Sequence, residues 1–476
     1  MKRATDDRSD NLFTLGEVLK VTGGRMAFNS IPGDFPLPGV SIDTRTIKPE
    51  ELFIPIVGEN YDGHDFIDEA FRKGASYSLT SRSIPKNEFS SRIIKVDDTL
   101  KALQRLAGFH RARFPDLHVI GITGSNGKSS VKDMIHGMLS VSYNTLKTPG
   151  NLNNEIGLPL TLLSIRDEHE AVVAELAMRA KGEIYELARL LKPEVGVITT
   201  IAETHIEFLG SLKAIAEAKA ELLECLPPDG CAILPADSPY FSLLVRHSRA
   251  PVISFGSRKQ AHVFLVDAEP LGLEGWKARV RLFVQEISLQ VPFLGKHNLV
   301  NILAAVSAAR FMGIDPDKLQ EGINHIRLSP MRLEIQHGPG GIIILNDAYN
   351  ASPNSTKAAL ATVRDLDYPG RKIAVLGDML ELGHENESGH RMVGELAAIS
   401  GLAYLITIGE SAKIIAETAR KSGLEGRVFS FPDKEQALEK LISLLKPGDL
   451  VLFKSSRKLK LETIVKSLIE SGEVIR

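Results

Sequence analysis

The chain has 476 residues, 43% of them hydrophobic and 24% charged, a composition that fits a globular protein of several domains. Its 57 Lys and Arg residues are balanced by 59 Asp and Glu residues, so no basic field exists to hold nucleic acid or an anionic membrane surface. We therefore expect small-molecule partners and no nucleic acid. The first 20 residues include acidic residues and no apolar core of the length of a signal peptide, and no uncharged apolar run of about 18 residues occurs, so we expect a cytoplasmic protein without membrane insertion. We also expect a monomer.

The two cysteines, Cys225 and Cys231, have no second pair of metal-binding residues beside them. We interpret them as reduced structural thiols.

The periodicity of the sequence changes twice and predicts an α/β protein of three domains: a small α/β module over 1–112, a central mononucleotide-binding domain over 113–328, and a Rossmann-like domain over 329–476. In the first domain, extended runs at 39–42 and 52–57 precede a helical pattern at 64–75.

The second domain starts with a β-branched run at 117–123, a glycine turn, and a pattern typical of an amphipathic helix. Apolar runs at 171–176 and 195–201 predict parallel strands buried on both faces of a sheet. Alternating residues at 278–284 and 287–291 predict an antiparallel hairpin. The third domain contains a second βαβ series, with apolar runs at 341–347, 372–378, 403–409 and 449–455.

The glycine turn resembles a phosphate-binding loop: Gly124, Ser125, Asn126, Gly127, Lys128, Ser129 and Ser130. The match is partial, because Ile122 stands where that loop has its first glycine. The glycines let backbone N–H groups approach phosphate oxygens, Lys128 can bridge phosphates, and Ser129 can offer a hydroxyl to Mg²⁺. The alternative is an ordinary glycine turn, which does not explain why a lysine and a serine stand at the start of the predicted helix.

Polar residues just beyond buried parallel strands are candidates for the same site, because ligands bind at the carboxyl ends of such strands. Glu175 follows one strand and His205 follows another, beside Glu203 and Thr204. A carboxylate there can complete a Mg²⁺ shell and an imidazole can take a second metal. The alternative is a strand-end carboxylate and a surface histidine.

Lys219 falls on the apolar face of the helix predicted over 211–224. A buried lysine must be neutralised, paired or chemically altered. In the alternative, its stem packs while its ammonium group reaches water.

These residues resemble the Mur ligase family over almost the whole chain. The resemblance lies in eight segments: 41–75, 121–135 (GITGSNGKSSVKDMI), 148–163, 294–305 (LGKHNLVNILAA), 331–334 (MRLE), 346–355, 375–383 (VLGDMLELG) and 451–462. SVKDM and VLGDMLELG are most similar to the branch of the family that adds D-alanyl-D-alanine. The family's usual residues are replaced at Ala177, Ala180, Asn346, Ser352 and Ser455, which leaves the shape of the dipeptide and sugar pockets open.

The resemblance implies an ATP-dependent amide ligase that joins D-alanyl-D-alanine to UDP-N-acetylmuramoyl-tripeptide through an acyl phosphate. It implies two Mg²⁺ ions and a CO₂-derived carbamate on Lys219, with Ser129, Glu175, His205 and Lys219 around the metals. Lys128 and Arg332 would contact phosphates, Asp347 the ribose, and Asn298 and Asn301 the adenine. The candidates for substrate binding are Ser41, Thr44, Arg45, Asn60, Asp62, His64, Asn151 and Asn154.

Two alternatives stay open at this point. A relative with another acceptor, such as the third-residue Mur ligase or folylpolyglutamate synthetase, has the same phosphate loop. A regulatory protein that senses or hydrolyses ATP without ligation is a different class. The sequence does not name the general base for the amine or the third residue of the peptide.

Overall fold

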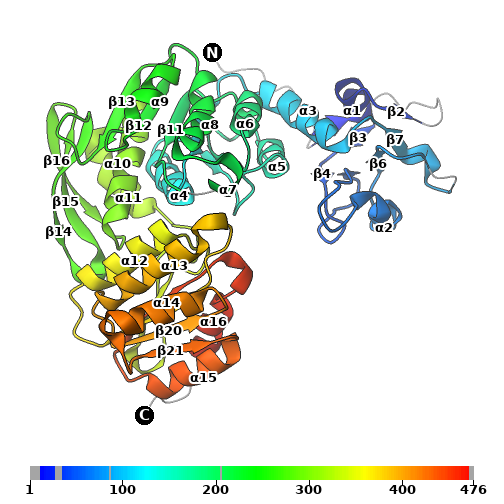
Figure 1. The fold of residues 1–476 in the computed structure, drawn as a ribbon. Helices are drawn as coiled ribbons and strands as arrows, with labels where there is room; N and C mark the ends of the chain where they lie inside the picture. Colours follow the sequence, from blue (N-terminus) through cyan, green and yellow to red (C-terminus); the bar gives the residue numbers. More distant parts are fainter. Residues whose placement is uncertain (1–10, 27–34, 85–86, 204–205, 471–476) are drawn as a thin grey trace. The chain divides into compact units, whose positions relative to one another are not determined.

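The computed structural model describes residues 11–26, 35–84, 87–203 and 206–470. They fall into two compact units, which we treat separately (Figure 1). Unit 1 consists of residues 1–118, 148–170 and 189–192, and unit 2 of residues 119–147, 171–188 and 193–476. None of the described helices is both long and apolar enough to cross a membrane.

Unit 1 contains a small sheet with the strand order β2-β7-β6-β5-β4, in which β4 to β7 are parallel. Helix α3 begins at Asp98, whose side chain accepts a hydrogen bond from the backbone of Lys101, and it packs against α5. The elements are β1 Phe13–Thr14, α1 Leu15–Thr22, β2 Arg25–Met26, β3 Pro36–Leu37, β4 Val40–Ser41, β5 Leu52–Phe53, α2 Ile67–Arg72, β6 Tyr77–Thr80, β7 Ile93–Lys95, α3 Thr99–Ala112 and α5 Gly157–Leu163.

The larger sheet of unit 2 has nine strands within the described segments, in the order β16-β15-β14-β13-β12-β11-β8-β10-β9. The pairs β9–β10, β8–β11, β11–β12, β12–β13 and β13–β14 are parallel, and β14, β15 and β16 form an antiparallel extension. The strands are β8 His118–Thr123, β9 Thr145–Lys147, β10 Ala171–Glu175, β11 Val195–Ile198, β12 Cys231–Pro235, β13 Val252–Gly256, β14 Val263–Pro270, β15 Trp276–Leu282 and β16 Gln285–Val291. The two parallel runs and the hairpin predicted from the sequence are confirmed.

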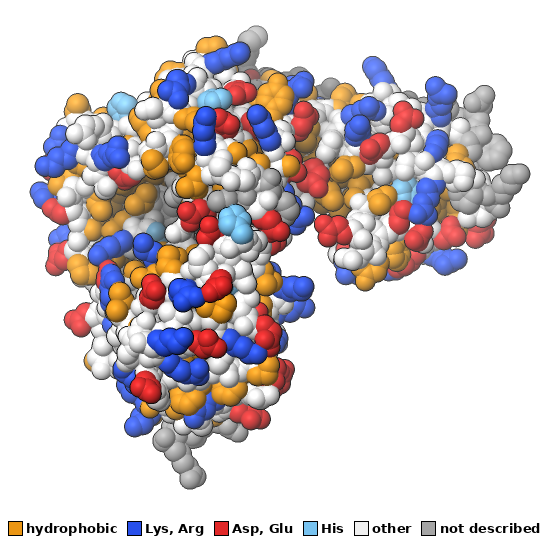
Figure 2. All heavy atoms as spheres, viewed as in Figure 1, with side chains coloured by type: hydrophobic (Ala, Val, Ile, Leu, Met, Phe, Trp, Pro, Cys, Tyr) orange, Lys and Arg blue, Asp and Glu red, His pale blue; other side chains and the backbone are white. Residues whose placement is uncertain are grey.

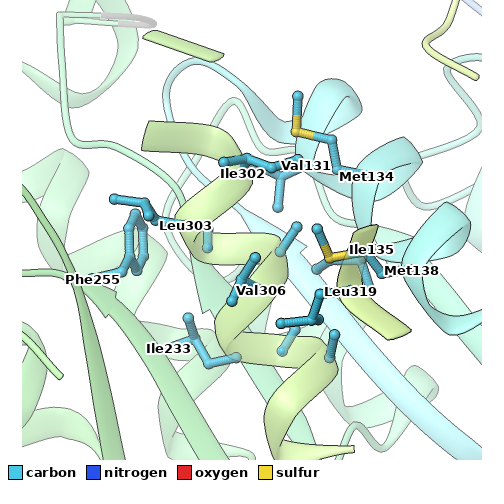
Figure 3. Packing of buried hydrophobic residues seen from close by; sticks show 14 of the residues in the cluster. Val131, Met134, Ile135, Met138, Ile233, Phe255, Ile302, Leu303, Val306 and Leu319 are labelled. Carbon is cyan, nitrogen blue, oxygen red and sulfur yellow. The ribbon is translucent and has the colours of Figure 1, made fainter. Parts of the chain in front are cut away.

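Helices α4 and α10 pack against this sheet around a buried apolar cluster (Figure 3). Val131, Met134 and Ile135 of α4 meet Ile302 and Val306 of α10 there. The helices of this part are α4 Lys128–Leu139, α6 Glu183–Leu191, α7 Ile206–Leu209, α8 Leu212–Glu224, α9 Phe241–His247, α10 Lys296–Phe311 and α11 Leu319–His325.

Helix α4 differs from the amphipathic helix that the sequence predicts, because two of its charged residues are buried as well. Lys132 and Asp133 are 1% and 0% exposed. Helix α11 and the segment after it cover that side of α4, and a Cβ atom added at Gly137 would lie 2.7 Å from the Cα atom of Ile326.

The second sheet of unit 2 has the order β17-β18-β22-β19-β20-β21, and all its strands except β17 pair in parallel. Helices cover both faces, as in Rossmann-like folds, and the predicted α/β class is confirmed. The elements are β17 Glu334–His337, β18 Ile343–Asn346, α12 Pro353–Asp365, β19 Lys372–Gly377, α13 Asn386–Ala398, β20 Tyr404–Ile408, α14 Ala412–Ala419, β21 Val428–Phe431, α15 Lys434–Leu444, β22 Leu450–Lys454 and α16 Glu462–Glu470.

The face drawn in Figure 2 carries Lys and Arg side chains interspersed with Asp and Glu. This distribution agrees with the net charge of −2.

Candidate active site

The loop of residues 124–127 lies at the carboxyl end of β8, between the strand and the start of α4. Strand β8 is flanked by β11 and β10, and the chain continues from β8 to the β9–β10 side before it returns to β11. This is the point where the strand order reverses, which is where open α/β sheets bind their ligands.

Both loop glycines are required by close neighbours. Gly124 has a φ of +152° and Gly127 a φ of +84°. A Cβ atom at Gly124 would lie 1.9 Å from Oγ1 of Thr199, and one at Gly127 would lie 2.7 Å from Oδ1 of Asn301. The loop therefore approaches β11 and α10 more closely than any side chain permits.

Two threonines at the end of β11 hold the loop. The backbone N–H groups of Ser125 and Asn126 donate to the carbonyl and the hydroxyl oxygen of Thr200, at 2.8 and 3.0 Å. The hydroxyl groups of Thr199 and Thr200 donate to the carbonyl of Asn126, at 2.6 and 3.1 Å. Sequence reasoning missed both threonines as loop contacts, because it placed them inside the strand predicted over 195–201, whereas β11 ends at Ile198.

Lys128 folds back over the loop, with Nζ donating to the carbonyl of Gly124 at 2.9 Å. Burial lowers the pKa of this lysine, the positive charge of Arg332 lowers it further, and the carboxylate of Glu175 opposes both. The lysine therefore lies half-buried beside the loop's backbone.

Ser129, Glu175 and Arg332 form the centre of the candidate site. The Ser129 hydroxyl donates to Oε2 of Glu175 at 2.8 Å and accepts from Nη2 of Arg332 at 3.2 Å. The guanidinium carbon of Arg332 is 4.0 Å from the ring centroid of Tyr349, which sequence reasoning also missed. Arg332 belongs to the segment that leads into the second sheet, so that segment reaches the phosphate loop.

Lys219 lies on α8 and is 2% exposed, so the alternative in which its ammonium group reaches water is wrong. Burial holds its pKa well below the usual value of a lysine, and the nearby charge of Lys128 lowers it further. His205, the second metal ligand suggested by the sequence, lies outside the described residues.

A cavity of about 270 Å³ opens beside this centre, lined by Asn298, Arg332, Phe293, Leu328 and Ser329 among others. The amide of Asn298 donates to the carbonyl of Leu294 at 2.8 Å and accepts from Asn301 at 3.0 Å. Asn298 therefore lines the cavity, and Asn301 lies next to Gly127 of the loop.

Asp347, the predicted ribose contact, follows β18. Its carboxylate lies 2.5 Å from Nζ of Lys454 and accepts from the backbone N–H of Leu333 at 3.2 Å. Lys454 was not predicted from the sequence.

Comparison with known proteins identifies the family. The chain matches the descriptions "Mur ligase family, catalytic domain" over 36–111, "Mur ligase middle domain" over 122–309 and "Mur ligase, glutamate ligase domain" over 331–457. It is 42% identical to the UDP-N-acetylmuramoyl-tripeptide–D-alanyl-D-alanine ligase of Bacillus subtilis, with 91% of this chain and 93% of that protein covered. The chain belongs to the Mur ligase family.

Solved structures of Mur ligases agree with this membership. MurF from Acinetobacter baumannii superposes with a TM-score of 0.88 at 28% identity, with 96% of this chain and 99% of that chain covered. MurF from Thermotoga maritima, solved in complex with ADP, gives a TM-score of 0.78 at 27% identity over 91% of this chain and 97% of that one.

The substrate residues suggested by the sequence of this Mur ligase lie in unit 1. His64 is buried, with Nδ1 2.6 Å from Oδ1 of Asp62, and Ser41 is also buried. The hydroxyl of Thr44 donates to Glu69 at 3.1 Å, and the exposed Arg45 pairs with Asp43 at 2.6 Å.

Three asparagines complete that set, and all three are exposed: Asn60, Asn151 and Asn154. The side-chain oxygen of Asn154 accepts from the backbone N–H of Gly157 at 2.9 Å, which fixes the start of α5.

Proposed function

We propose that this Mur ligase joins D-alanyl-D-alanine to the terminal carboxylate of UDP-N-acetylmuramoyl-tripeptide, with hydrolysis of ATP to ADP and phosphate, in peptidoglycan precursor synthesis. The observation that carries the proposal is the 42% identity, over nine-tenths of both chains, to a ligase of that name. The phosphate loop, Lys128 and Arg332 supply the chemistry such a ligase needs.

The reaction has two steps. An oxygen of the substrate carboxylate attacks the γ-phosphorus of ATP, the bond to the β-phosphate oxygen breaks, and an acyl phosphate and ADP result. The amine of D-alanyl-D-alanine then attacks the acyl carbon, the carbon–oxygen bond to phosphate breaks, and an amide, phosphate and a proton are released. Lys128, which lies beside the loop, and Arg332, which donates to Ser129, would stabilise the charge that develops on the phosphoryl oxygens.

The nucleotide would occupy the loop and the neighbouring cavity. The backbone N–H groups of Gly127 to Ser130, at the start of α4, would face the phosphates. The cavity of about 270 Å³ beside Asn298 is large enough for an adenine ring, and Asp347 stands beyond Arg332 for the ribose.

Magnesium fits the oxygen atoms at the centre of the site. The hydroxyl of Ser129 and the carboxylate of Glu175 are adjacent hard oxygen donors, and Glu175 is 2% exposed. When bound, Mg²⁺ would neutralise charge on the phosphates. His205 remains the proposed ligand of a second ion.

We also propose a carbamate on Lys219. Burial favours the neutral amine, which is the form that adds to CO₂ and releases one proton. The product is an anion that suits a metal site, whereas the ammonium form would repel the metals.

The remaining parts of the proposal concern organisation. We propose functional domains over 1–112, 113–328 and 329–476, supported by three family matches within those bounds. We propose that the UDP-sugar binds the first of them, at Ser41, Thr44, Arg45, Asn60, Asp62 and His64, with Asn151 and Asn154 contributing. We propose a cytoplasmic location, because the substrates are ATP and water-soluble precursors. We also propose that the protein is a monomer.

Testing amine acceptors decides the function. Purified protein is incubated with ATP, Mg²⁺ and UDP-linked tripeptide, and each acceptor is scored by mass spectrometry. We expect an amide product with D-alanyl-D-alanine. Turnover with a free amino acid and none with the dipeptide would refute the choice, and rapid phosphate release from ATP alone would favour a regulatory ATPase.

The carbamate has its own test. ¹³C NMR under ¹³CO₂ should show a carbamate signal that is absent in Lys219→Ala, and short carboxylic acids should partly restore that variant's activity. Absence of both effects would remove the carbamate from the proposal and leave the ligase function standing.

A further inference from the structure

Asp133, in the SVKDM segment of α4, has no part in the chemistry described so far, yet its carboxylate is completely buried. Its Oδ1 atom accepts from Nζ of Lys147 at 2.6 Å. Its Oδ2 atom accepts from both the backbone N–H and the hydroxyl of Ser329, at 2.7 and 2.6 Å. A buried carboxylate with two donors from one residue holds that residue firmly.

Ser329 lies in the connection between the matches to the middle and the C-terminal Mur ligase domains, which end and begin at residues 309 and 331. Three residues later the same connection carries Arg332, which donates to the hydroxyl of Ser129. Ser129 and Asp133 are four residues apart in α4 and therefore share one face of the helix. One turn of α4 thus contacts both ends of the segment 329–332.

The backbone between these contacts is constrained. Met331 and Leu333, on either side of Arg332, have backbone φ values of +60° and +51°, which residues other than glycine rarely adopt. Their N–H groups donate to Oε2 of Glu334 at 2.9 Å and to Oδ1 of Asp347 at 3.2 Å. Such a backbone conformation persists only where surrounding contacts hold it. The hydrogen bonds between Asp133 of α4 and Ser329 attach this segment to the helix.

We propose that Asp133 is a positioning residue: it anchors the interdomain connection at Ser329, so that Arg332 reaches the phosphate end of the same helix. This inference rests on the proposed function in one respect, namely that Arg332 contacts the phosphates of ATP. The competing explanation is that Asp133 only neutralises Lys147 and Lys132.

A double-mutant cycle between Ser329→Ala and Arg332→Gln separates the two explanations. Ser329→Ala removes one donor to Asp133 and leaves every charge in place. Affinity for a non-hydrolysable ATP analogue with Mg²⁺ is measured by calorimetry in the wild type, both single variants and the double variant, so that an inactive enzyme still gives a value.

We expect Ser329→Ala to weaken binding about 5- to 20-fold when Arg332 is present and less than about 2-fold in Arg332→Gln. Ser329→Thr, which keeps the hydroxyl, should lose less affinity than Ser329→Ala when Arg332 is present. Equal losses in both backgrounds would overturn the proposal, as would a loss in Ser329→Thr equal to that in Ser329→Ala.

Lys147→Met is the matched control, because it removes the ion pair of Asp133 and leaves the bonds to Ser329. It should lower the melting temperature without changing the coupling between Ser329 and Arg332. A coupling that disappears in Lys147→Met would support the neutralisation explanation instead. Ligation by the wild type is measured separately: if it fails while the coupling is present, the proposed acceptor is wrong and the anchor stands.

Discussion

The replacement of Gly124 by alanine tests whether the loop geometry binds the nucleotide. The new methyl group would lie 1.9 Å from Oγ1 and 3.1 Å from the backbone nitrogen of Thr199. Thr199 cannot rotate away freely, since its hydroxyl donates to the carbonyl of Asn126 at 2.6 Å. The alanine therefore either displaces the loop or breaks that hydrogen bond.

The expected magnitude follows from two contributions. A φ of +152° at a residue with a side chain costs about 1–3 kcal/mol. Loss of the Thr199 hydrogen bond costs about 1 kcal/mol. If only the observed loop conformation binds phosphates, the sum of roughly 2–4 kcal/mol weakens ATP affinity by about 30- to 1000-fold.

Isothermal titration with ATP and Mg²⁺ measures this loss, and Gly182→Ala is the matched control. Gly182 also has a positive φ, +91°, but nothing lies within 4 Å of its added Cβ atom. We expect the control to bind ATP like the wild type. Binding by Gly124→Ala within about threefold of the wild type would refute the reasoning, and so would an equal loss in the control.

Three further predictions concern stability and thiol reactivity. Burial lowers the pKa of His110 to about 4 in the folded protein. Between pH 6.5 and pH 4 the imidazole is therefore neutral in the folded state, whereas in the unfolded chain, where its pKa is near 6.5, it takes up a proton. The free energy of unfolding should therefore fall by about 3 kcal/mol between pH 6.5 and 4, and His110→Gln should remove that part of the dependence in urea titrations. Burial raises the pKa of Cys231 to about 11, so a disulfide reagent at pH 8 should label Cys225 in the native protein and Cys231 only after unfolding. Lys454→Met should lower the free energy of unfolding by about 3 kcal/mol, and adding Asp347→Asn should recover part of it, because the single change leaves a largely buried carboxylate without its cation; equal stability of the two variants would contradict this.

The sequence predicted features that depend on local patterns. The parallel strands and the glycine turn follow from residue types within one segment, whereas the position of Lys219 on an apolar helix face left its burial open until the structure showed it. The family resemblance added roles for residues far apart in the chain. The structure brings Ser129, Glu175 and Arg332 into hydrogen-bonding distance, although their roles in catalysis stay predictions.

Features that depend on contacts between distant segments were not predictable in this way. Thr199 and Thr200 follow a buried strand, and nothing in their own segment indicates that they bind Asn126, 73 and 74 residues earlier in the chain. Tyr349 and Lys454 were missed for the same reason. Position beyond a strand end indicated the correct edge of the sheet, but it did not indicate which side chains the loop would touch.

Helix α4 shows how such a failure can itself be informative. Its apolar residues have the spacing of one helical face, which places Lys132 and Asp133 on the face expected to meet water, yet both are buried. A buried charge is costly unless it is hydrogen-bonded, so the segment that covers it must supply donors. Ser329 and Lys147 supply them to Asp133. Helix α4, which begins at the phosphate loop, therefore has no solvent-exposed side at Asp133. The segment that contains Ser329 and Arg332 covers this side, and the carboxylate of Asp133 fixes the segment at Ser329.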